Sequence, residues 1–269
     1  MTENGFYGII KRNSQQSVGE RKMDLEIYQL ILIALIVACA SYIQSVTGFG
    51  FGIFAMMFLP YILLYTEANI LSSIISALTS VGVAIALWRK ISWKNIIFPL
   101  IGCVITTYAA VVFISSQETR VLKILLGIAL VALSIYFYLF SGKIKIKPTW
   151  YAGLIAGLLS GIMGGMFSMG GPPVVIYFIQ SEDDSDNYLA TISAYFVFSG
   201  AISIIMKASS GFMTSNVWFA LIVGIIGLLL GATLGKLTRD KTKPQMIKKA
   251  VYAVMAVSGV INIVTSLFF

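Results

Sequence analysis

Two glycine-rich stretches interrupt an otherwise apolar sequence and contain the residues best suited to binding chemistry. The first, residues 45–60, reads SVTGFGFGIFAMMFLP, with glycine at three alternate positions; the second, residues 157–177, reads GLLSGIMGGMFSMGGPPVVIY. Glycine permits backbone conformations that other residues avoid, and proline is tolerated in the first turn of a helix. We therefore expect one helix to begin near Gly50 or Phe51 and another near Pro172.

The start of a helix favours anions, because its first N–H groups are unpaired and it carries about half a positive charge. Two such helix starts that converge would bind a small oxyanion, with nearby hydroxyl and amide side chains completing the site. No Lys or Arg is expected deep within a membrane span, so backbone N–H groups should carry the binding. The predicted substrate-binding residues are Gln44, Ser45, Thr47, Gly48, Phe49, Gly50, Asn69, Ser73, Ser168, Gly170, Gly171, Pro172 and Ser193.

Helix packing is the competing interpretation of the same small residues. Gly, Ser and Thr in membrane helices commonly let two helices approach closely, and for any single serine this role is the commoner one. The two glycine breaks taken together favour binding instead. A third set, Gly227, Gly231 and Gly235, has four-residue spacing and predicts either a packing face or a dimer contact.

The elements that must position these residues are predicted to be membrane-spanning helices. The chain of 269 residues is 58% hydrophobic and 11% charged, whereas a soluble domain has roughly 25% charged residues. A helix of about 20 apolar residues crosses the ~30 Å hydrocarbon core of a bilayer. Uncharged stretches of that length are residues 70–88, 95–115, 187–206, 216–235 and 250–269. We therefore predict an all-α, polytopic membrane protein.

Composition also excludes several classes of function. The sequence has no histidine, which removes the commonest metal ligand and proton shuttle, and no acidic pair lies within a predicted span. We expect no enzyme activity, no metal and no cofactor. Cys39 and Cys103 lie in apolar segments and are expected to be packing residues. The net charge of +8 comes mainly from short loops, where Lys and Arg set membrane topology, so a nucleic-acid partner is not expected.

The order of the predicted segments recurs along the chain. A glycine-broken segment at 25–65 precedes three spans, and a second one at 150–180 precedes three more. Matching positions lie about 120 residues apart, as Thr47 and Phe167 do. We therefore predict two internal repeats, each a glycine-broken (re-entrant or hairpin) segment followed by three transmembrane helices. Paired broken helices of this kind mark the substrate sites of secondary transporters.

The predicted divisions of the chain follow from this duplication. They are a disordered N-terminal tail at 1–24, a first repeat at 25–140, a basic linker at 141–149 and a second repeat at 150–269. The tail is polar and basic, and Met23 could serve as the functional start. Residues 1–22 are therefore expected to be dispensable.

The distribution of Lys and Arg leaves the topology open. One net crossing per broken segment gives parallel repeats and divides the basic residues 11 to 8 between the two sides. A returning hairpin in each gives inverted repeats and a 12 to 7 division, and a mixed scheme gives 16 to 3. Lys207 counts as a loop residue throughout. We favour inverted repeats, because alternating access arises naturally from that symmetry. Glu67, at a helix mouth, is expected to be an N-terminal helix charge.

The sequence resembles the sulfite exporter TauE/SafE family, also called the toluenesulfonate uptake permease family. The resemblance lies in SVTGFGFG and in GLLSGIMGGMFSMGGPPVVIY, and it extends over about residues 25–268. It implies a carrier in a bacterial-type cytoplasmic membrane for small anions such as sulfite or organosulfonates.

From this resemblance we expect a multi-pass secondary transporter in the cell membrane that exports such an anion. Import of a small organic anion is one alternative, and a membrane scaffold without transport is another. The expected partners are the small anion, the lipid bilayer and, as one option, a second copy of the chain in a homodimer.

Overall fold

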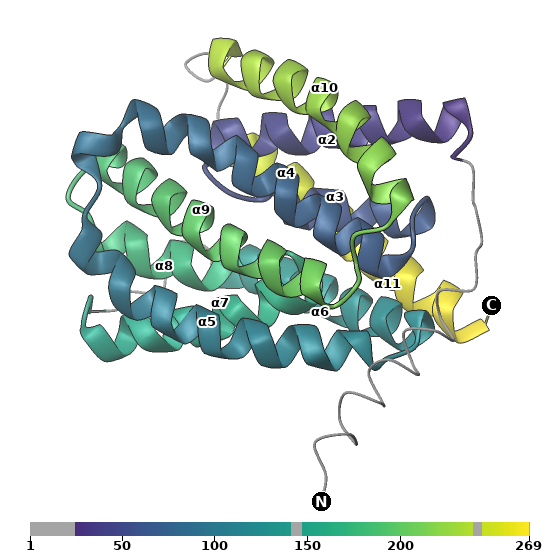
Figure 1. Ribbon diagram of the computed structural model, residues 1–269. Coiled ribbons are helices and arrows are strands. Elements are labelled where there is room, and N and C mark those ends of the chain that lie inside the picture. The colour runs from purple at the N-terminus through teal and green to yellow at the C-terminus, as the bar shows by residue number, and fades with distance from the viewer. Residues whose placement is uncertain (1–24, 141–146, 239–243, 269) are drawn as a thin grey trace, which may run out of the picture.

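The protein is a bundle of helices, seen from the side in Figure 1. The computed structural model describes residues 25–140, 147–238 and 244–268, and within these ranges every regular element is a helix. The predicted tail at 1–24 and most of the predicted linker at 141–149 lie outside the described residues. The all-α fold class is confirmed.

Most of the α-helices are long, and two are short. The α-helices of the described residues are α2 (Ile27–Thr47), α3 (Phe51–Phe58), α4 (Tyr65–Ala86), α5 (Trp93–Ser115), α6 (Thr119–Phe140), α7 (Trp150–Phe167), α8 (Gly171–Ser181), α9 (Ser185–Ser209), α10 (Ser215–Thr238) and α11 (Pro244–Phe268). Single 3-10 turns, η1 (Leu59–Tyr61) and η2 (Trp88–Lys90), follow α3 and α4.

Helix length separates the helices that can cross a bilayer from those that cannot. Within the described residues, α2, α4, α5, α6, α7, α9 and α10 are long and apolar enough to span. Helices α3 and α8 have 8 and 11 residues, and at 1.5 Å per residue they reach only about 12 and 16 Å. Each short helix therefore covers about half of the ~30 Å hydrocarbon core.

The outer surface of the bundle is apolar. On α10 the side chains of Phe219, Ile222 and Leu230 are each more than half exposed, and Trp93 is exposed at the start of α5. Large apolar side chains that point outward along whole helices need lipid around them, and Trp is typical of the membrane interface. The chain is a multi-pass membrane protein, which in a bacterium resides in the cell membrane.

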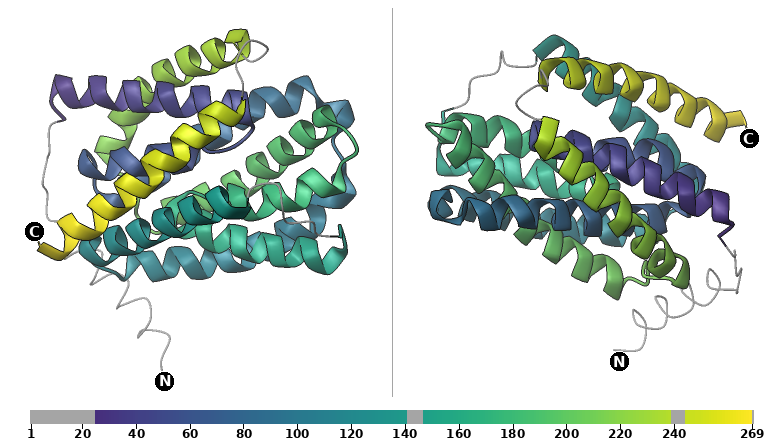
Figure 2. Two further views of the ribbon diagram at one scale, coloured as in Figure 1. Left: turned by 180° about the vertical axis from the view of Figure 1, so that it is seen from behind. Right: turned by 90° about the horizontal axis from the view of Figure 1, so that it is seen from above.

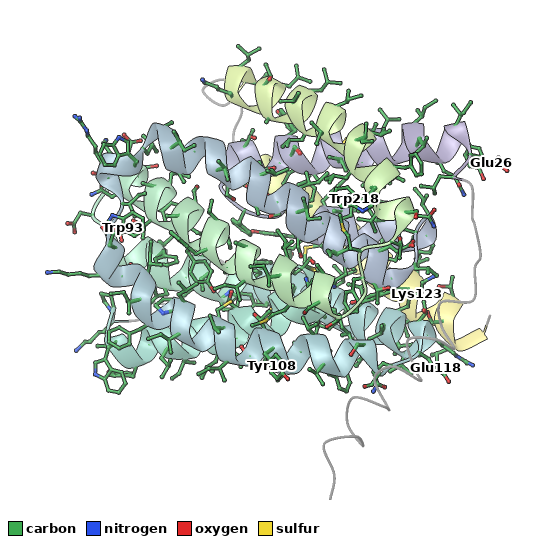
Figure 3. All side chains as sticks on the ribbon, viewed as in Figure 1. Glu26, Trp93, Tyr108, Glu118, Lys123 and Trp218 are labelled. Atoms are coloured by element: carbon green, nitrogen blue, oxygen red, sulfur yellow. The ribbon has the colours of Figure 1, made fainter. Side chains whose placement is uncertain are left out.

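The labelled side chains of Figure 3 show the direction of several helices. Glu26, just before α2, and Glu118, between α5 and α6, lie at one end of the bundle, whereas Trp93, at the start of α5, lies at the other. Helices α2 and α5 therefore run in opposite directions. Figure 1 shows that α11 ends at the same end of the bundle at which α2 begins.

Helices α5 and α7 run in the same direction and pack through glycine. Gly157 of α7 lies against Pro99 of α5, and Gly161 lies against Cys103, one turn further along both helices. A β-carbon at Gly157 would sit 2.0 Å from the Pro99 carbonyl oxygen. Only glycine allows these two helices to approach this closely.

Helices α2 and α10 form a second pair with a common direction. Gly227 lies against the backbone of Ala34 and Gly231 against that of Ala38, and Figure 2 shows the two helices side by side. Of the two interpretations of this glycine stripe, packing within the chain is the one that the structure supports. The stripe is covered by α2 and is not free for a dimer contact.

Helices α4 and α9 run in opposite directions, as do α6 and α11. Lys90, just after the end of α4, contacts Asp186 at the start of α9. Ser73, in the first half of α4, contacts Lys207 near the end of α9. Arg120, near the start of α6, donates a hydrogen bond to the carbonyl oxygen of Ser266, near the end of α11, at 2.6 Å. The four helix pairs together enclose the two glycine-rich stretches.

Each glycine-rich stretch ends a long helix with a residue in the left-handed region. Gly48 caps the end of α2, with a φ of 83° and its N–H bonded to the Gln44 carbonyl oxygen; Ser168 caps the end of α7, with a φ of 55°. A short helix follows in each case, beginning at Phe51 for α3 and at Gly171 for α8. These starts agree with the positions expected from the sequence.

Candidate functional site

A cavity of about 70 Å³ lies where the turn between α2 and α3 meets the turn between α7 and α8. Residues of α4, α5 and α9 complete its wall. A water molecule needs roughly 10–15 Å³ of such space, so the cavity has room for about five to seven atoms of that size. This space is sufficient for a compact ion.

The two turns reach the cavity because α3 lies very close to the end of α7. A β-carbon at Gly52 would fall 1.7 Å from the carbonyl oxygen of Ser168, so glycine is required at this contact. On the other side, the Ser160 hydroxyl donates to the Gly170 carbonyl oxygen at 2.6 Å, and the Tyr195 hydroxyl donates to Ser160 at 2.8 Å. These contacts fix both turns against each other.

Most of the predicted binding residues line this cavity. The lining residues among them are Gln44, Phe49, Gly50, Ser73, Ser168, Gly170, Gly171 and Pro172. They come from α2, α4, the start of α8 and the two turns, which are far apart in the sequence.

The other predicted residues lie beside the cavity rather than in its wall. Ser45 packs against Gly235 of α10, and the Thr47 hydroxyl donates to the Ile43 carbonyl oxygen at 2.8 Å. The remaining three are Gly48, which caps α2, Asn69, which bonds to the end of α7, and Ser193, which is buried in α9. None of these five residues lines the cavity.

Helix α3 presents unpaired backbone donors to the cavity. Its first helical hydrogen bond runs from the Phe54 N–H to the Gly50 carbonyl oxygen, so the N–H groups of Phe51, Gly52 and Ile53 precede the helical ladder, and all three residues line the cavity. The start of α8 is poorer in donors, because Pro172 and the following proline have no N–H. The helix-start contribution to anion binding therefore comes mainly from α3.

Lys207 corrects the sequence prediction, which placed it in a loop and expected no basic residue near the site. It belongs to α9, and its side chain is fully buried. Its Nζ donates to the Ser73 hydroxyl at 2.7 Å, to the Ser168 hydroxyl at 3.1 Å and to the Gly164 carbonyl oxygen at 3.1 Å. All three acceptors line the cavity. The prediction was wrong because a lysine so near a helix end normally extends toward water.

Side chains of α4 hold the end of α7 in place. The Tyr65 hydroxyl and the Asn69 amide both donate to the Met166 carbonyl oxygen at 2.7 Å, and the Ser168 hydroxyl donates to the Asn69 carbonyl oxygen at 2.7 Å. The last carbonyl groups of α7 thus receive partners that the helix itself cannot supply. Ser73 continues this face of α4 into the cavity.

Sequence reasoning missed several further lining residues, which lie on α3, α4, α5, α7 and α9 and in the turn after α7. They are Phe51, Gly52, Ile53, Ser76, Ala77, Cys103, Thr107, Ser160, Gly164, Met169, Phe196, Ser199, Gly200 and Ser203. Ser199, Ser203 and Lys207 recur every four residues, which places them on one face of a helix. This polar stripe in an apolar helix is the signal that could have identified them.

Glu67 lies outside the cavity wall and has a structural role. Its carboxylate accepts a hydrogen bond from the Leu64 N–H at 3.1 Å and another from the Thr214 hydroxyl at 2.6 Å. The first contact satisfies an N–H at the start of α4, where a negative charge is favourable. The second ties α4 to the connection between α9 and α10. The structure therefore agrees with the expected helix-start role.

Comparison with known proteins gives two matches. Residues 33–261 match the family described as Sulfite exporter TauE/SafE. The chain is also similar to a protein of Cupriavidus necator named "Probable sulfite/organosulfonate exporter TauE", with 22% identity over 237 residues that cover 84% of this chain and 90% of that protein. No solved structure matches.

Proposed function

The chain belongs to the sulfite exporter TauE/SafE family, and from this membership we propose that it is a secondary transporter that exports a small oxyanion, sulfite or a small organosulfonate. The family consists of membrane transporters rather than enzymes. The observation that carries the proposal is a cavity inside a membrane-spanning bundle, lined by hydroxyl groups and by the unpaired N–H groups of a helix start.

The chemistry of the cavity wall supports an anion as cargo. Hydroxyl groups and the first N–H groups of α3 are hydrogen-bond donors, and the wall contains no carboxylate among the described residues. Sulfite has four non-hydrogen atoms and fits a space of about 70 Å³, whereas an organosulfonate with a longer chain requires the cavity to open. The name of the Cupriavidus necator relative makes sulfite and organosulfonates the first anions to test.

Inverted repeats are part of the proposal, and the helix bounds support the duplication. Helix α2 ends at Thr47 and α7 at Phe167, α3 begins at Phe51 and α8 at Gly171, and both offsets are 120 residues. In this scheme each short helix returns partway through the bilayer, so each repeat has five segments and the second begins on the opposite side from the first.

The packing directions favour inverted repeats over the two other schemes. In parallel repeats α4 and α9 would run in the same direction, but they run in opposite directions. In the mixed scheme α2 and α10 would oppose each other, but they run together. Inverted repeats account for all four helix pairs. They also permit alternating access to a site located between the two halves.

The membrane potential supports outward transport. An inside-negative potential favours the exit of an anion by roughly 2.3 kcal/mol per charge per 100 mV. Export therefore needs no coupling ion. Among the described residues, no carboxylate lines the cavity to suggest one.

The test is anion flux from proteoliposomes that contain the purified full chain. Vesicles loaded with sulfite or methanesulfonate should release the anion, and Gly50→Leu and Gly170→Leu should abolish release while the protein still inserts. Gly82→Ala is the matched control, because nothing lies within 4 Å of an added β-carbon there. Full anion release in both leucine variants would show that the anion does not bind at the two glycine-rich turns. No flux and no anion-dependent stabilisation of the unmodified chain would favour a scaffold without transport.

A further inference from the structure

Two polar residues on one face of α9 have a charge or a hydrogen-bonding group that contacts within the protein do not fully satisfy. Lys207 is fully buried with its Nζ beside the cavity, and Ser203, one turn earlier, lines the cavity directly. The Ser203 side chain is 7% exposed, and its Oγ has no hydrogen-bond partner among the described residues. A buried hydroxyl without a partner costs free energy, so this position is suited to a ligand.

The charge of Lys207 is also incompletely balanced by the protein. Its three acceptors are neutral oxygen atoms, and within the described part of the chain the recorded ion pair is the surface pair of Lys90 and Asp186. Gly164 belongs to the last turn of α7, where the helix dipole supplies about half a negative charge. The remaining half of the ammonium charge has no counter-charge.

The unbalanced charge of Lys207 matters because its side chain points into the protein rather than toward water. A lysine close to the end of a membrane helix usually extends its ammonium group to the interface, where water solvates it. Lys207 lies two residues from the end of α9, yet its ammonium group turns inward and is fully buried. A buried ammonium group needs a compensating partner, and the cavity is the space in which such a partner fits.

We propose that Lys207 and Ser203 form the anion-recognition side of the cavity. This inference rests on the proposed function and adds residues and a mechanism to it. The Ser203 hydroxyl donates directly to the anion. Lys207 is held beside the cavity by Ser73 and Ser168, whose hydroxyls accept from its Nζ and donate to the Asn69 carbonyl oxygen. It also supplies the positive charge that balances the cargo.

This arrangement sets the class of substrate. The uncompensated part of the Lys207 charge suits a compact oxyanion, as does the Ser203 hydroxyl, which has no partner among the described residues. An aminosulfonate would be disfavoured, because its ammonium group would lie near Lys207 and would meet no carboxylate among the lining residues that the structure describes. Sulfite and methanesulfonate should therefore bind more tightly than a zwitterionic sulfonate of similar size.

The test compares sulfite affinity among four variants of the purified full chain. Lys207→Met should raise the Kd at least about tenfold, because it removes the positive charge that balances the anion. Ser203→Ala should raise it about two- to tenfold, and Lys207→Arg should recover part of the loss. Lys90→Gln, which removes an exposed lysine, is the charge-matched control and should bind as the unmodified chain does.

The competing explanation is that Lys207 only caps the end of α7. In that case Lys207→Met would lower the melting temperature of the anion-free protein but would leave the Kd for sulfite unchanged, and this result would overturn the inference. If Lys207→Met does not fold, Ser203→Ala decides, and an unchanged Kd again overturns it. Failure of the unmodified chain to bind or transport any anion would instead refute the proposed function itself.

Discussion

Ser168 connects the end of α7 to the cavity, and its backbone is strained. It is the non-glycine residue with positive φ among those described, a conformation that costs a residue with a side chain about 1–2 kcal/mol. Its hydroxyl donates to the Asn69 carbonyl oxygen and accepts from Lys207. Glycine would suit the backbone better, so the hydroxyl explains why serine is present. Strain held by hydrogen bonds is common at functional sites.

Two substitutions at Ser168 should separate the backbone from the hydroxyl. Ser168→Gly and Ser168→Ala both lose the hydroxyl and should weaken sulfite binding to a similar extent. Only glycine relieves the left-handed strain, so the alanine variant should be less stable by ~1 kcal/mol. Melting temperatures without anion and Kd values for sulfite check this. Equal melting temperatures, or unchanged affinity in either variant, would contradict it.

Cys103 offers a direct probe of cavity occupancy. It lines the cavity, whereas Cys39 is exposed on α2. In a Cys39→Ser background, a small neutral thiol reagent should modify Cys103, and methanesulfonate at ten times its Kd should slow the reaction by about tenfold because few sites remain empty. Methanesulfonate is used because sulfite would consume the reagent. In the converse variant, Cys103→Ser, labelling of Cys39 should not respond to methanesulfonate. An anion that is transported without protecting Cys103 would place its site elsewhere.

At the scale of helices, the two short helices, α3 and α8, offer unequal numbers of hydrogen-bond donors to the cavity. Helix α3 offers three N–H groups before its first helical hydrogen bond, while two prolines open α8. The proposed duplication therefore does not give two equal halves of a binding site. Donors come from α3 on one side, and the polar face of α9 supplies the charge on the other. The anion would lie between elements of both halves.

The interface between α5 and α7 gives a prediction for helix packing. Gly157→Ala places a methyl group where the Pro99 carbonyl oxygen lies, so it should separate the helices and greatly reduce the yield of folded protein. Gly82→Ala meets open space and should leave stability equal or slightly higher, since alanine favours helix by up to ~1 kcal/mol. Size-exclusion profiles and melting temperatures in detergent distinguish the two outcomes. A well-folded Gly157→Ala variant would show that the interface can adjust.

At the scale of the whole molecule, the proposed preference for anions depends on the positive charge near the cavity. The buried ammonium group of Lys207 and the partial charge at the start of α3 favour an anion over a neutral solute. The lipid-facing surface carries exposed apolar side chains, so the polar groups of the site are shielded from hydrocarbon. In the proposed transport mechanism, the cavity between these helices is the place where the anion crosses the apolar barrier.

Uncoupled export predicts a defined equilibrium distribution of the anion. At an imposed potential of 100 mV, a monovalent anion should accumulate about 50-fold on the positive side, which corresponds to 2.3 kcal/mol per charge. Proteoliposomes with a potassium-diffusion potential and methanesulfonate as cargo measure this ratio. A smaller ratio that depends on the pH gradient would indicate proton coupling, and a distribution independent of potential would contradict electrogenic transport.

Several features of the fold could be predicted from the sequence because they depend on local chemistry. Uncharged runs of about 20 residues have few alternatives to a membrane helix. The helix ends at Gly48 and the helix start at Gly171 follow from the conformational freedom of glycine and the proline pair after it. The sequence does not distinguish which serine faces the cavity: Ser45 packs against Gly235 of α10, whereas Ser73 lines the cavity.

By itself, the sequence determined that the chain is a helical membrane protein with two glycine-rich breaks, because composition and backbone preferences act within a few residues. Only the tertiary structure decided which polar side chains share one cavity and that Lys207 points inward. Its position near the end of α9 allows the side chain to extend to water or into the core. The choice depends on Ser73, Gly164 and Ser168, which lie on other helices and come together only when the bundle packs.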